Sequence, residues 1–335
     1  MSLRDHRDLG EDAHTQLRDA YLGALHVHVQ ARRALGDVHD AFDGDGIPWL
    51  VIKGAALAQA AYSRTDLRSY TDVDVVVPPV AFPDAVRALE RAGHTILDRN
   101  WRAIRSEMNG QVHARLAAGV TVDLHWNLVN HANLRQAFPI DTAPLFERSR
   151  EVMVGDTPVR TLSSADTLVH LALHTCLSGG DRLIWLKDVE QVLLHDQPAW
   201  PEVIERARAW NAGVVLATVL DLTRSTLGAE IPEDARRALA SSWWHALVRV
   251  TDQVAPVETA TGGASAAQVL RRSIRGSERG TMVHAARHVY RWTRGAAALF
   301  PATAGNAADD PASVLYAAGG AADRDAYLRA VTAAR

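Results

Sequence analysis

Residues Ile47–Pro78 read IPWLVIKGAALAQAAYSRTDLRSYTDVDVVVP. The stretch starts with an apolar run, which is followed by Lys53 and Gly54 and then by an Ala/Leu-rich segment of helical composition. A loop with two arginines comes next, and a second apolar run opens with Asp72 and Asp74. A strand, a glycine turn, a helix and a strand with two carboxylates form a layout that can hold a triphosphate and a divalent cation.

The two carboxylates predict a metal site. Side chains at positions i and i+2 of a strand point to the same side, so Asp72 and Asp74 present their carboxylates together. Two like charges at this spacing repel, and a cation between them relieves the repulsion. Carboxylates completed by phosphates and water are typical of Mg²⁺, with Mn²⁺ as the alternative ion. Asp-x-Asp also occurs in ordinary surface turns, but here it begins a run of valines at the mouth of a buried strand.

The glycine turn predicts a phosphate site. Gly54 lets the backbone approach a ligand closely, and the helix that follows directs its free N–H groups to the same place. Lys53 adds a positive charge. A solvated surface lysine is the usual alternative, but of 36 basic residues only Lys53 and Lys187 are lysines. A lysine at this turn is therefore best explained by its compact charge and its reach toward a phosphate.

This block resembles the DNA polymerase beta-type nucleotidyltransferase superfamily and, within it, a bacterial branch of uncharacterised nucleotidyltransferases. The shared pattern is an apolar strand with Lys-Gly, a helix, a Tyr, an Arg, and Asp-x-Asp on a second apolar strand. Most of the superfamily has Gly-Ser or Gly-Gly at the turn, whereas Lys-Gly is typical of this branch. The resemblance covers about residues 14–250, and the residues that carry it most specifically are Lys53, Gly54, Tyr62, Arg68, Asp72 and Asp74.

The resemblance implies a Mg²⁺-dependent transfer of a nucleoside monophosphate from an NTP to an acceptor, with release of pyrophosphate. It implies catalytic and metal-binding roles for Asp72 and Asp74, and for a third carboxylate on a later strand. Asp123, in the segment Val120–Trp126, is the candidate for that third carboxylate. The acceptor is expected to be a small molecule or a peptide.

Further substrate contacts follow from the same resemblance. Arg68 joins Lys53 and Gly54 as an expected phosphate-binding residue. His125 shares a strand face with Asp123 and either orients a carboxylate, contacts substrate, or simply packs beside Trp126. An acidic residue near Lys187 and Asp188 is a family feature, so these two residues are expected to bind the nucleotide; a helical ion pair near the surface is the alternative.

Composition limits the class of protein. The chain has 335 residues, 47% of them hydrophobic and 22% charged, as in an ordinary globular protein. A net charge of −3 argues against polymer nucleic acid as substrate. The single Cys176 fits a reducing cytoplasm. We expect no signal peptide and no membrane span, and the sequence does not indicate an oligomeric state.

The fold is expected to be α+β, a small mixed β-sheet core with flanking helices followed by an all-helical domain. Predicted parts are an N-terminal helix within residues 1–45, a catalytic domain over 46–150, a helical domain over 151–250, and a linker with C-terminal helices over 251–335. Strands are predicted at 95–98, 101–108 and 111–116. Helices are predicted at 13–42, 55–62, 85–92, 167–177, 182–194, 200–210, 214–227, 235–247, 282–299 and 323–334. Residues 255–280 are predicted to form a linker.

Two other functions compete with the enzyme. The superfamily includes antitoxin relatives, so a nucleotide-binding regulatory partner with little turnover is the second hypothesis. A plain helical scaffold is the third, and it would make the charged motif a coincidence. His170 and His174 are spaced i,i+4, which can suit Zn²⁺, but no third ligand stands at a convincing spacing.

Overall fold

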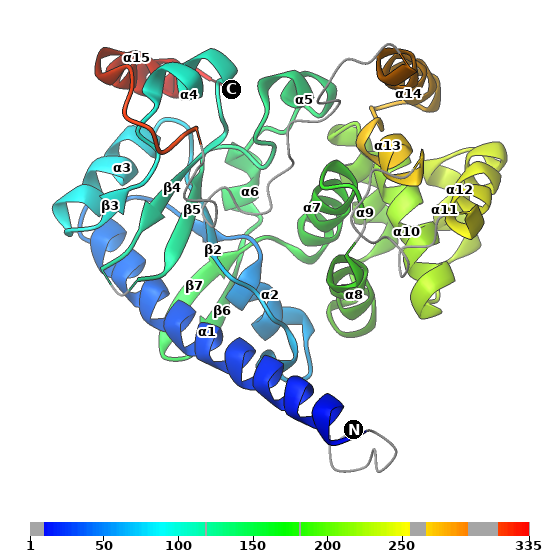
Figure 1. Ribbon diagram of the computed structural model, residues 1–335, viewed down its shortest axis with the longest axis horizontal. Helices are drawn as coiled ribbons and strands as arrows, with labels where there is room; N and C mark the ends of the chain where they lie inside the picture. The colour runs from blue at the N-terminus through cyan, green and yellow to red at the C-terminus, as the bar shows by residue number, and fades with distance from the viewer. Residues whose placement is uncertain (1–9, 118, 181, 255–265, 294–313, 335) are drawn as a thin grey trace.

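One seven-stranded mixed sheet forms the centre of the first part of the molecule (Figure 1). The computed structural model describes residues 10–117, 119–180, 182–254, 266–293 and 314–334. The sheet and the many helices confirm the expected α+β class. The strands lie in the order β3-β4-β5-β2-β1-β7-β6 and have the bounds β1 Leu50–Val51, β2 Val73–Val76, β3 Thr95–Ile96, β4 Gln111–Arg115, β5 Thr121–His125, β6 Arg150–Val154 and β7 Thr157–Thr161.

Strand β2 lies in the middle of the sheet, parallel to β5 and antiparallel to β1. Its valines are β-branched and buried, as suits a central strand. Val73 and Val75 join the apolar cluster on one face of the sheet, and Val76 joins the cluster on the other. Because side chains alternate along a strand, Asp74 shares the face of Val76.

Helices cover the face of the sheet to which Val73 and Val75 point. They are α1 Glu11–Asp43, α3 Phe82–Arg91, α4 Trp101–Glu107 and α15 Ala321–Thr332. Leu35 and Phe42 of α1 and Tyr327 of α15 are fully buried in this cluster. The helices predicted over 13–42 and 323–334 are therefore confirmed as α1 and α15. The last helix thus returns to the sheet from the far end of the chain (Figure 1).

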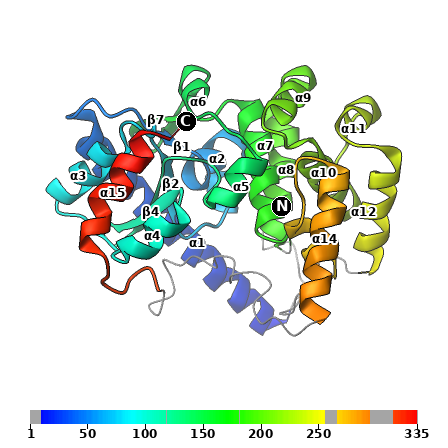
Figure 2. The ribbon, with the colours of Figure 1, turned by 90° about the horizontal axis from the view of Figure 1, so that it is seen from above.

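The other face of the sheet is turned toward a group of helices, seen beside the sheet in Figure 2. Ile52 and Val76 of the sheet share one buried cluster with Leu168 of α7. We call residues 164–293 the helical unit, and residues 11–161 with 321–332 the sheet unit. The helical unit contains α7 Ser164–Leu177, α8 Leu183–Gln191, the π-helical turn η3 Val192–Asp196, α9 Trp200–Ala209, α10 Gly213–Leu227, α11 Glu233–Leu239, α12 Ser242–Val254, α13 Ala266–Arg272 and α14 Glu278–Thr293.

The sheet unit also contains shorter helices. They are α2 Gly54–Ala61, the 3₁₀ turn η2 Thr65–Leu67, α5 Ala132–Ala137 and α6 Ala143–Glu147.

The sheet continues past residue 150. Strand β7 pairs in parallel with β1, through Val51 and Thr161, so the sheet ends only at Thr161. We propose that the catalytic part of the chain extends to this residue. No helix of the described ranges is long and apolar enough to cross a membrane.

The strand predicted over 101–108 is wrong, because these residues form helix α4. The Asn100 side chain accepts a hydrogen bond from the Ala103 backbone N–H at 3.2 Å, which caps the helix. Trp101 and Ile104, three residues apart, are buried on one helical face. A capping Asn followed by an i,i+3 apolar pair is a helix signal that the strand prediction overlooked.

Two predictions in the helical part also need correction. The single helix predicted over 235–247 is two helices, because Ala240 is extended between α11 and α12. The Ser241 backbone N–H and hydroxyl both donate to the Glu278 carboxylate at 2.7 Å, which holds the break. The predicted linker contains helix α13, while residues 255–265 lie outside the described residues. The predicted helix over 282–299 begins at Glu278, and its residues beyond 293 lie outside the described residues.

Candidate functional site

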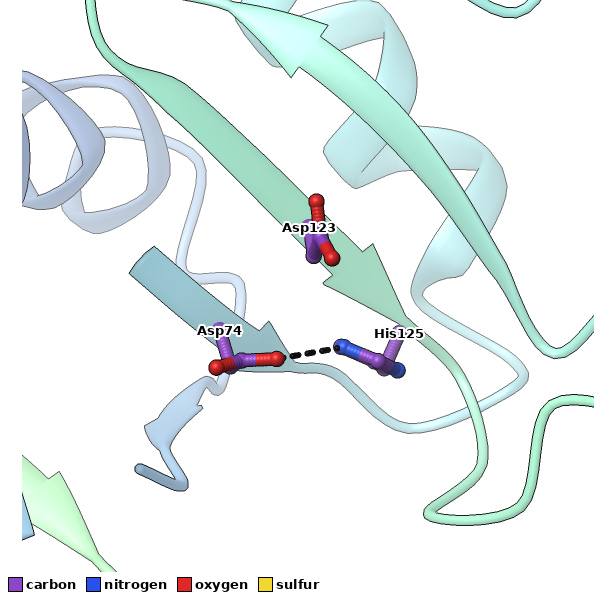
Figure 3. Close-up of side chains that lie close together, drawn as sticks. All are labelled: Asp74, Asp123 and His125. Carbon is purple, nitrogen blue, oxygen red and sulfur yellow. Dashed lines mark hydrogen bonds and ion pairs between the residues drawn. The ribbon is translucent and has the colours of Figure 1, made fainter. Parts of the chain in front are cut away.

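The pairing of β2 with β5 sets two carboxylates side by side. Asp74 is opposite Asp123 in this parallel pair, and Val76 is opposite His125. Since Val122 and Leu124 face the α1 side of the sheet, Asp123 and His125 point with Asp74 toward the helical unit. Each of Asp74, Asp123 and His125 offers a ligand atom within 4.8 Å of the others (Figure 3). All three residues are buried.

Lys53 and Gly54 lie directly beside this cluster. Lys53 Nζ is 2.9 Å from Asp74 Oδ1, and the lysine side chain is only 14% exposed. Gly54 opens helix α2 with φ +50°, and a Cβ there would lie 3.3 Å from the Asp72 carbonyl oxygen. Any other residue would be strained at this turn. The start of α2 therefore brings free N–H groups next to Lys53 and the carboxylates.

Asp72 is placed one residue before β2 and is half-buried. It is outside the trio of ligand atoms described above. Its negative charge nevertheless helps to raise the pKa values of Lys53 and Asp123. Asp72 thus contributes to the electrostatic environment of the cluster, but it is not one of the three residues whose ligand atoms lie together.

The two central carboxylates have opposite pKa shifts. Burial alone would raise the pKa of Asp74, but the charge of Lys53 and the hydrogen bond with His125 outweigh burial and hold it well below its usual range. Burial and the negative charges of Asp74 and Asp72 raise the pKa of Asp123 to about 8, although His113 opposes this rise. Asp74 therefore favours its charged form, whereas Asp123 favours its protonated form up to about pH 8.

His125 and Asp74 are in direct contact. The His125 Nε2 atom is 3.2 Å from Asp74 Oδ1, and Figure 3 shows this contact as a dashed line. Burial lowers the pKa of His125, which favours a neutral ring that donates one hydrogen bond. Of the interpretations of His125 given by sequence, this geometry matches the one in which it orients a carboxylate. Its neighbour Trp126 instead donates to the Asn109 carbonyl, at 2.8 Å.

Sequence reasoning missed His113 and Asp98. His113 is opposite Asp123 in the antiparallel β4–β5 pair, and its Nε2 lies 3.7 Å from Asp123 Oδ1. Both the Nδ1 atom and the backbone N–H of His113 lie 2.9 Å from Asp98 Oδ2. Burial alone would lower the pKa of His113, but the hydrogen bond to Asp98 and the charge of Asp123 raise it to about 9.

A row of ionisable side chains therefore crosses the sheet. Read from β1 through β2, β5 and β4 to the end of β3, it comprises Lys53, Asp74, Asp123, His113 and Asp98. Gln111 adds a hydrogen bond from its Nε2 to Asp123 Oδ2, at 3.3 Å. The alternation in the predicted strand 111–116 gave a signal for His113, since Val112 and Ala114 are apolar and share the cluster on the opposite face of the sheet.

Arg68 and Asp188 meet across the two units of the chain. Arg68 Nε and Nη2 each donate to one oxygen of Asp188 at 2.8 Å, and the Tyr62 hydroxyl donates to the same carboxylate at 2.5 Å. Burial would lower the pKa of Arg68, but the charge of Asp188 raises it. Arg68 Nη1 is buried and has no hydrogen-bond partner among the described residues.

Lys187 is not brought to the cluster. Its side chain is 44% exposed and forms an ion pair with Glu190 on the same helix. Its neighbour Asp188 points into the interior, because adjacent residues on a helix lie about 100° apart. The structure therefore separates the two residues that the sequence pattern grouped together.

The site fits a divalent cation with oxygen ligands. Asp123 Oδ1 is buried and accepts no hydrogen bond from the described residues, and His125 Nδ1 likewise has no partner there. Two carboxylates and an imidazole nitrogen within reach of one another can bind a divalent cation. Asp74 and Asp123 would hold the ion.

Comparison with known proteins identifies a family. The sequence profile of the family described as "Uncharacterised nucleotidyltransferase" matches residues 2–228, a range that contains every site residue described above. A search of curated protein sequences found no match. Among solved structures, the solution structure of the antibiotic-resistance factor ANT(2'')-Ia is similar to 53% of this chain and 90% of that chain, at 14% identity and a TM-score of 0.37.

Proposed function

The chain belongs to the family of uncharacterised nucleotidyltransferases, which makes it a transferase, and we propose that it moves a nucleoside monophosphate from an NTP to a hydroxyl group. The acceptor is a small molecule or a peptide, and pyrophosphate is released. The reaction depends on Mg²⁺, which Mn²⁺ can replace. The lone Cys176 suits a reducing compartment, so a cytoplasmic location is part of the proposal.

The observation that carries this proposal is the pairing of Asp74 with Asp123 beside Lys53. The two carboxylates are adjacent on parallel strands and share one face, and Lys53 and the start of α2 flank them. A surface turn or a structural ion pair would not need two buried acids on one face together with a glycine at φ +50°. Buried acids beside a phosphate-binding turn are what a metal–triphosphate substrate requires.

The residues divide the work as follows. Lys53 and the N–H groups at Gly54 bind the triphosphate, and Arg68 offers its unpartnered Nη1 to a phosphate oxygen. Asp74 and Asp123 would hold the cation, with Asp72 adding negative charge; when bound, the cation would offset the negative charge of the reacting phosphate. The acceptor oxygen forms a bond to the α-phosphorus of the NTP. The bond between the α-phosphorus and the oxygen that bridges to the β-phosphate breaks, and pyrophosphate leaves. The hydroxyl proton passes toward Asp123 in its deprotonated form.

Supporting residues keep this arrangement in place. His125 orients Asp74 through its hydrogen bond, and His113 orients Asp123 from the neighbouring strand. Asp188 fixes the guanidinium of Arg68 from the helical unit. We leave Lys187 out of the phosphate site because it pairs with Glu190 at a half-exposed position.

The test is pyrophosphate release. The wild-type protein is incubated with each NTP, Mg²⁺ and pools of hydroxyl-bearing small molecules and peptides, and pyrophosphate is measured with and without each pool. We expect release that requires both Mg²⁺ and one of the pools, and that falls at least about 100-fold in Asp123→Asn. Mg²⁺-dependent NTP binding without release from any pool would favour the regulatory partner hypothesis instead.

A further inference from the structure

His170 lies on helix α7, on the side of the helical unit that packs against the site face of the sheet. Its side chain is buried, with the residue 3% exposed. Neighbouring α7 residues Leu168 and Leu171 share the apolar cluster that includes Ile52 and Val76. The charges of Lys53 and Asp74 both act on the imidazole of His170. His170 is therefore a buried residue of the helical unit that lies within electrostatic reach of Lys53 and Asp74.

Neither ring nitrogen of His170 has a hydrogen-bond partner in the part of the chain that the structure describes. A buried polar group without a partner costs about 1–3 kcal/mol. His245, on α12 in the same unit, is equally buried at 6% exposure but is fully bonded. Its Nδ1 lies 2.5 Å from Asp221 Oδ2, and its Nε2 lies 3.2 Å from the Arg236 carbonyl oxygen. A histidine that serves only the fold would be expected to look like His245.

The surroundings of His170 favour a neutral ring. Burial and the charge of Lys53 lower the pKa of His170 to about 3. His174, one turn further along the same helical face, packs edge-on against Trp185 with ring centroids 5.2 Å apart. Arg182 stands over the same Trp185 ring.

A neutral imidazole offers one N–H donor and one acceptor nitrogen. Phosphate oxygens only accept hydrogen bonds, and a cation would use only the acceptor nitrogen. A hydroxyl group both donates and accepts, so a sugar can satisfy either nitrogen. We propose that His170 binds a hydroxyl group of the ribose of the donor nucleotide, which makes this histidine a sugar-recognising residue supplied by the helical unit. This proposal rests on the nucleotidyltransferase function proposed above.

The experiment compares two buried histidines by the same substitution. Melting temperature and nucleotide affinity are measured with Mg²⁺ for wild type, His170→Leu, His170→Gln and His245→Leu. The ligands are the four NTPs, followed by the 2'-deoxy and 3'-deoxy forms of the NTP that binds best. Affinities come from calorimetric titration, so the readout does not depend on turnover or on the acceptor.

We expect His170→Leu to leave the melting temperature of the free protein unchanged or higher, because an unpartnered polar group is removed. The same variant should lose about tenfold in NTP affinity, and His170→Gln should recover part of that loss. One deoxynucleotide should bind wild type about tenfold more weakly than its ribonucleotide, and His170→Leu should bind the two equally. His245→Leu should lower the melting temperature and leave the affinity unchanged.

Three results would overturn the proposal. The first is an NTP affinity of His170→Leu equal to that of the wild type. The second is equal binding of the ribonucleotide and both deoxynucleotides by the wild type. The third is a drop in melting temperature for His170→Leu as large as that for His245→Leu. Absence of any Mg²⁺-dependent NTP binding by the wild type would overturn the proposed function as well. Wild-type binding that His170→Leu retains in full would overturn only the role of His170.

Discussion

Asp74 and Asp123 are adjacent in the sheet but differ in charge at neutral pH. Asp74 has Lys53 and His125 as partners, so its pKa is lowered. Asp123 has more negative neighbours, and burial and those charges raise its pKa to about 8. A cation that binds between them therefore competes with a proton on Asp123 alone.

This competition predicts a pH dependence of cation binding. Below pH 8 the cation must displace the proton of Asp123, so affinity should rise up to about tenfold per pH unit and then level off. Mn²⁺ binding, followed by its electron paramagnetic resonance signal between pH 6 and 9, measures this directly. Asp123→Asn serves as the control, with weaker binding and a shallower pH dependence below pH 8. A flat profile in the wild type would contradict the assigned pKa shift.

The same shift predicts how the metal-free protein responds to pH. Below about pH 4 the Asp123 carboxyl is protonated in the folded and unfolded states alike. Between about pH 4 and 8 only the folded state keeps the proton, so Asp123 makes the free energy of unfolding fall as pH rises through this window. Urea unfolding at pH 5 and 8 should show a smaller decline in Asp123→Asn than in wild type; an equal decline in both would contradict it.

At the scale of the elements, the sequence predicted what a single strand or helix determines. The strand with Asp74, the glycine turn and the Asp123 strand were all recognisable because alternation and glycine placement are local signals. The row that links Lys53 to Asp98 was not, since it depends on which strands pair and in which register. Likewise, nothing in the chain order of Arg68 and Asp188 indicates that η2 and α8 meet.

The contact between the loop after η2 and helix α8 predicts a large stability effect. Asp188→Asn leaves the buried Arg68 charge uncompensated, because side-chain exposure is only 8% for Arg68 and 1% for Asp188. We expect a loss of about 3–5 kcal/mol in the free energy of unfolding, measured with urea. The double variant Arg68→Met, Asp188→Leu should recover most of this loss, since neither charge remains buried.

A matched control comes from the same helix. Glu190 pairs with the half-exposed Lys187, so Glu190→Gln should cost less than about 1 kcal/mol. If Asp188→Asn were no more destabilising than Glu190→Gln, the ion pair between Arg68 and Asp188 would not make the large contribution to the free energy of unfolding that we predict. The comparison separates a fully buried pair from one whose lysine is half-exposed, within a few residues of sequence.

On the scale of the whole molecule, the last described helix returns to the sheet formed by the first half of the chain. Helix α15 packs on the sheet although the helical unit lies between the last strand and α15 in sequence. Tyr327 of α15 donates its hydroxyl to the Asn109 carbonyl at 2.6 Å and accepts from Trp126 Nε1 at 3.0 Å. Amphipathic spacing predicted the helix, but a long-range packing partner has no local signature, so its place was not predictable.

This packing predicts that the last helix stabilises the catalytic part. Tyr327→Ala should lower the free energy of unfolding by about 3–5 kcal/mol, because a fully buried aromatic ring is lost. Tyr327→Phe should lower it by only about 1 kcal/mol, since Trp126 keeps its bond to the Asn109 carbonyl. Equal stability of wild type and Tyr327→Ala in urea unfolding would show that α15 does not hold the sheet unit.

The measurement that tests the central claim most directly is thermal unfolding with each NTP, with and without Mg²⁺, on wild type and Asp74→Asn. Asp156→Asn, a change at a fully exposed carboxylate, is the control. An NTP at about 100 times its Kd adds roughly 2.7 kcal/mol of stability. We predict a Mg²⁺-dependent rise in melting temperature in wild type and Asp156→Asn, and none in Asp74→Asn. No rise with any NTP, or the same rise in Asp74→Asn, would contradict a metal–nucleotide site at these carboxylates.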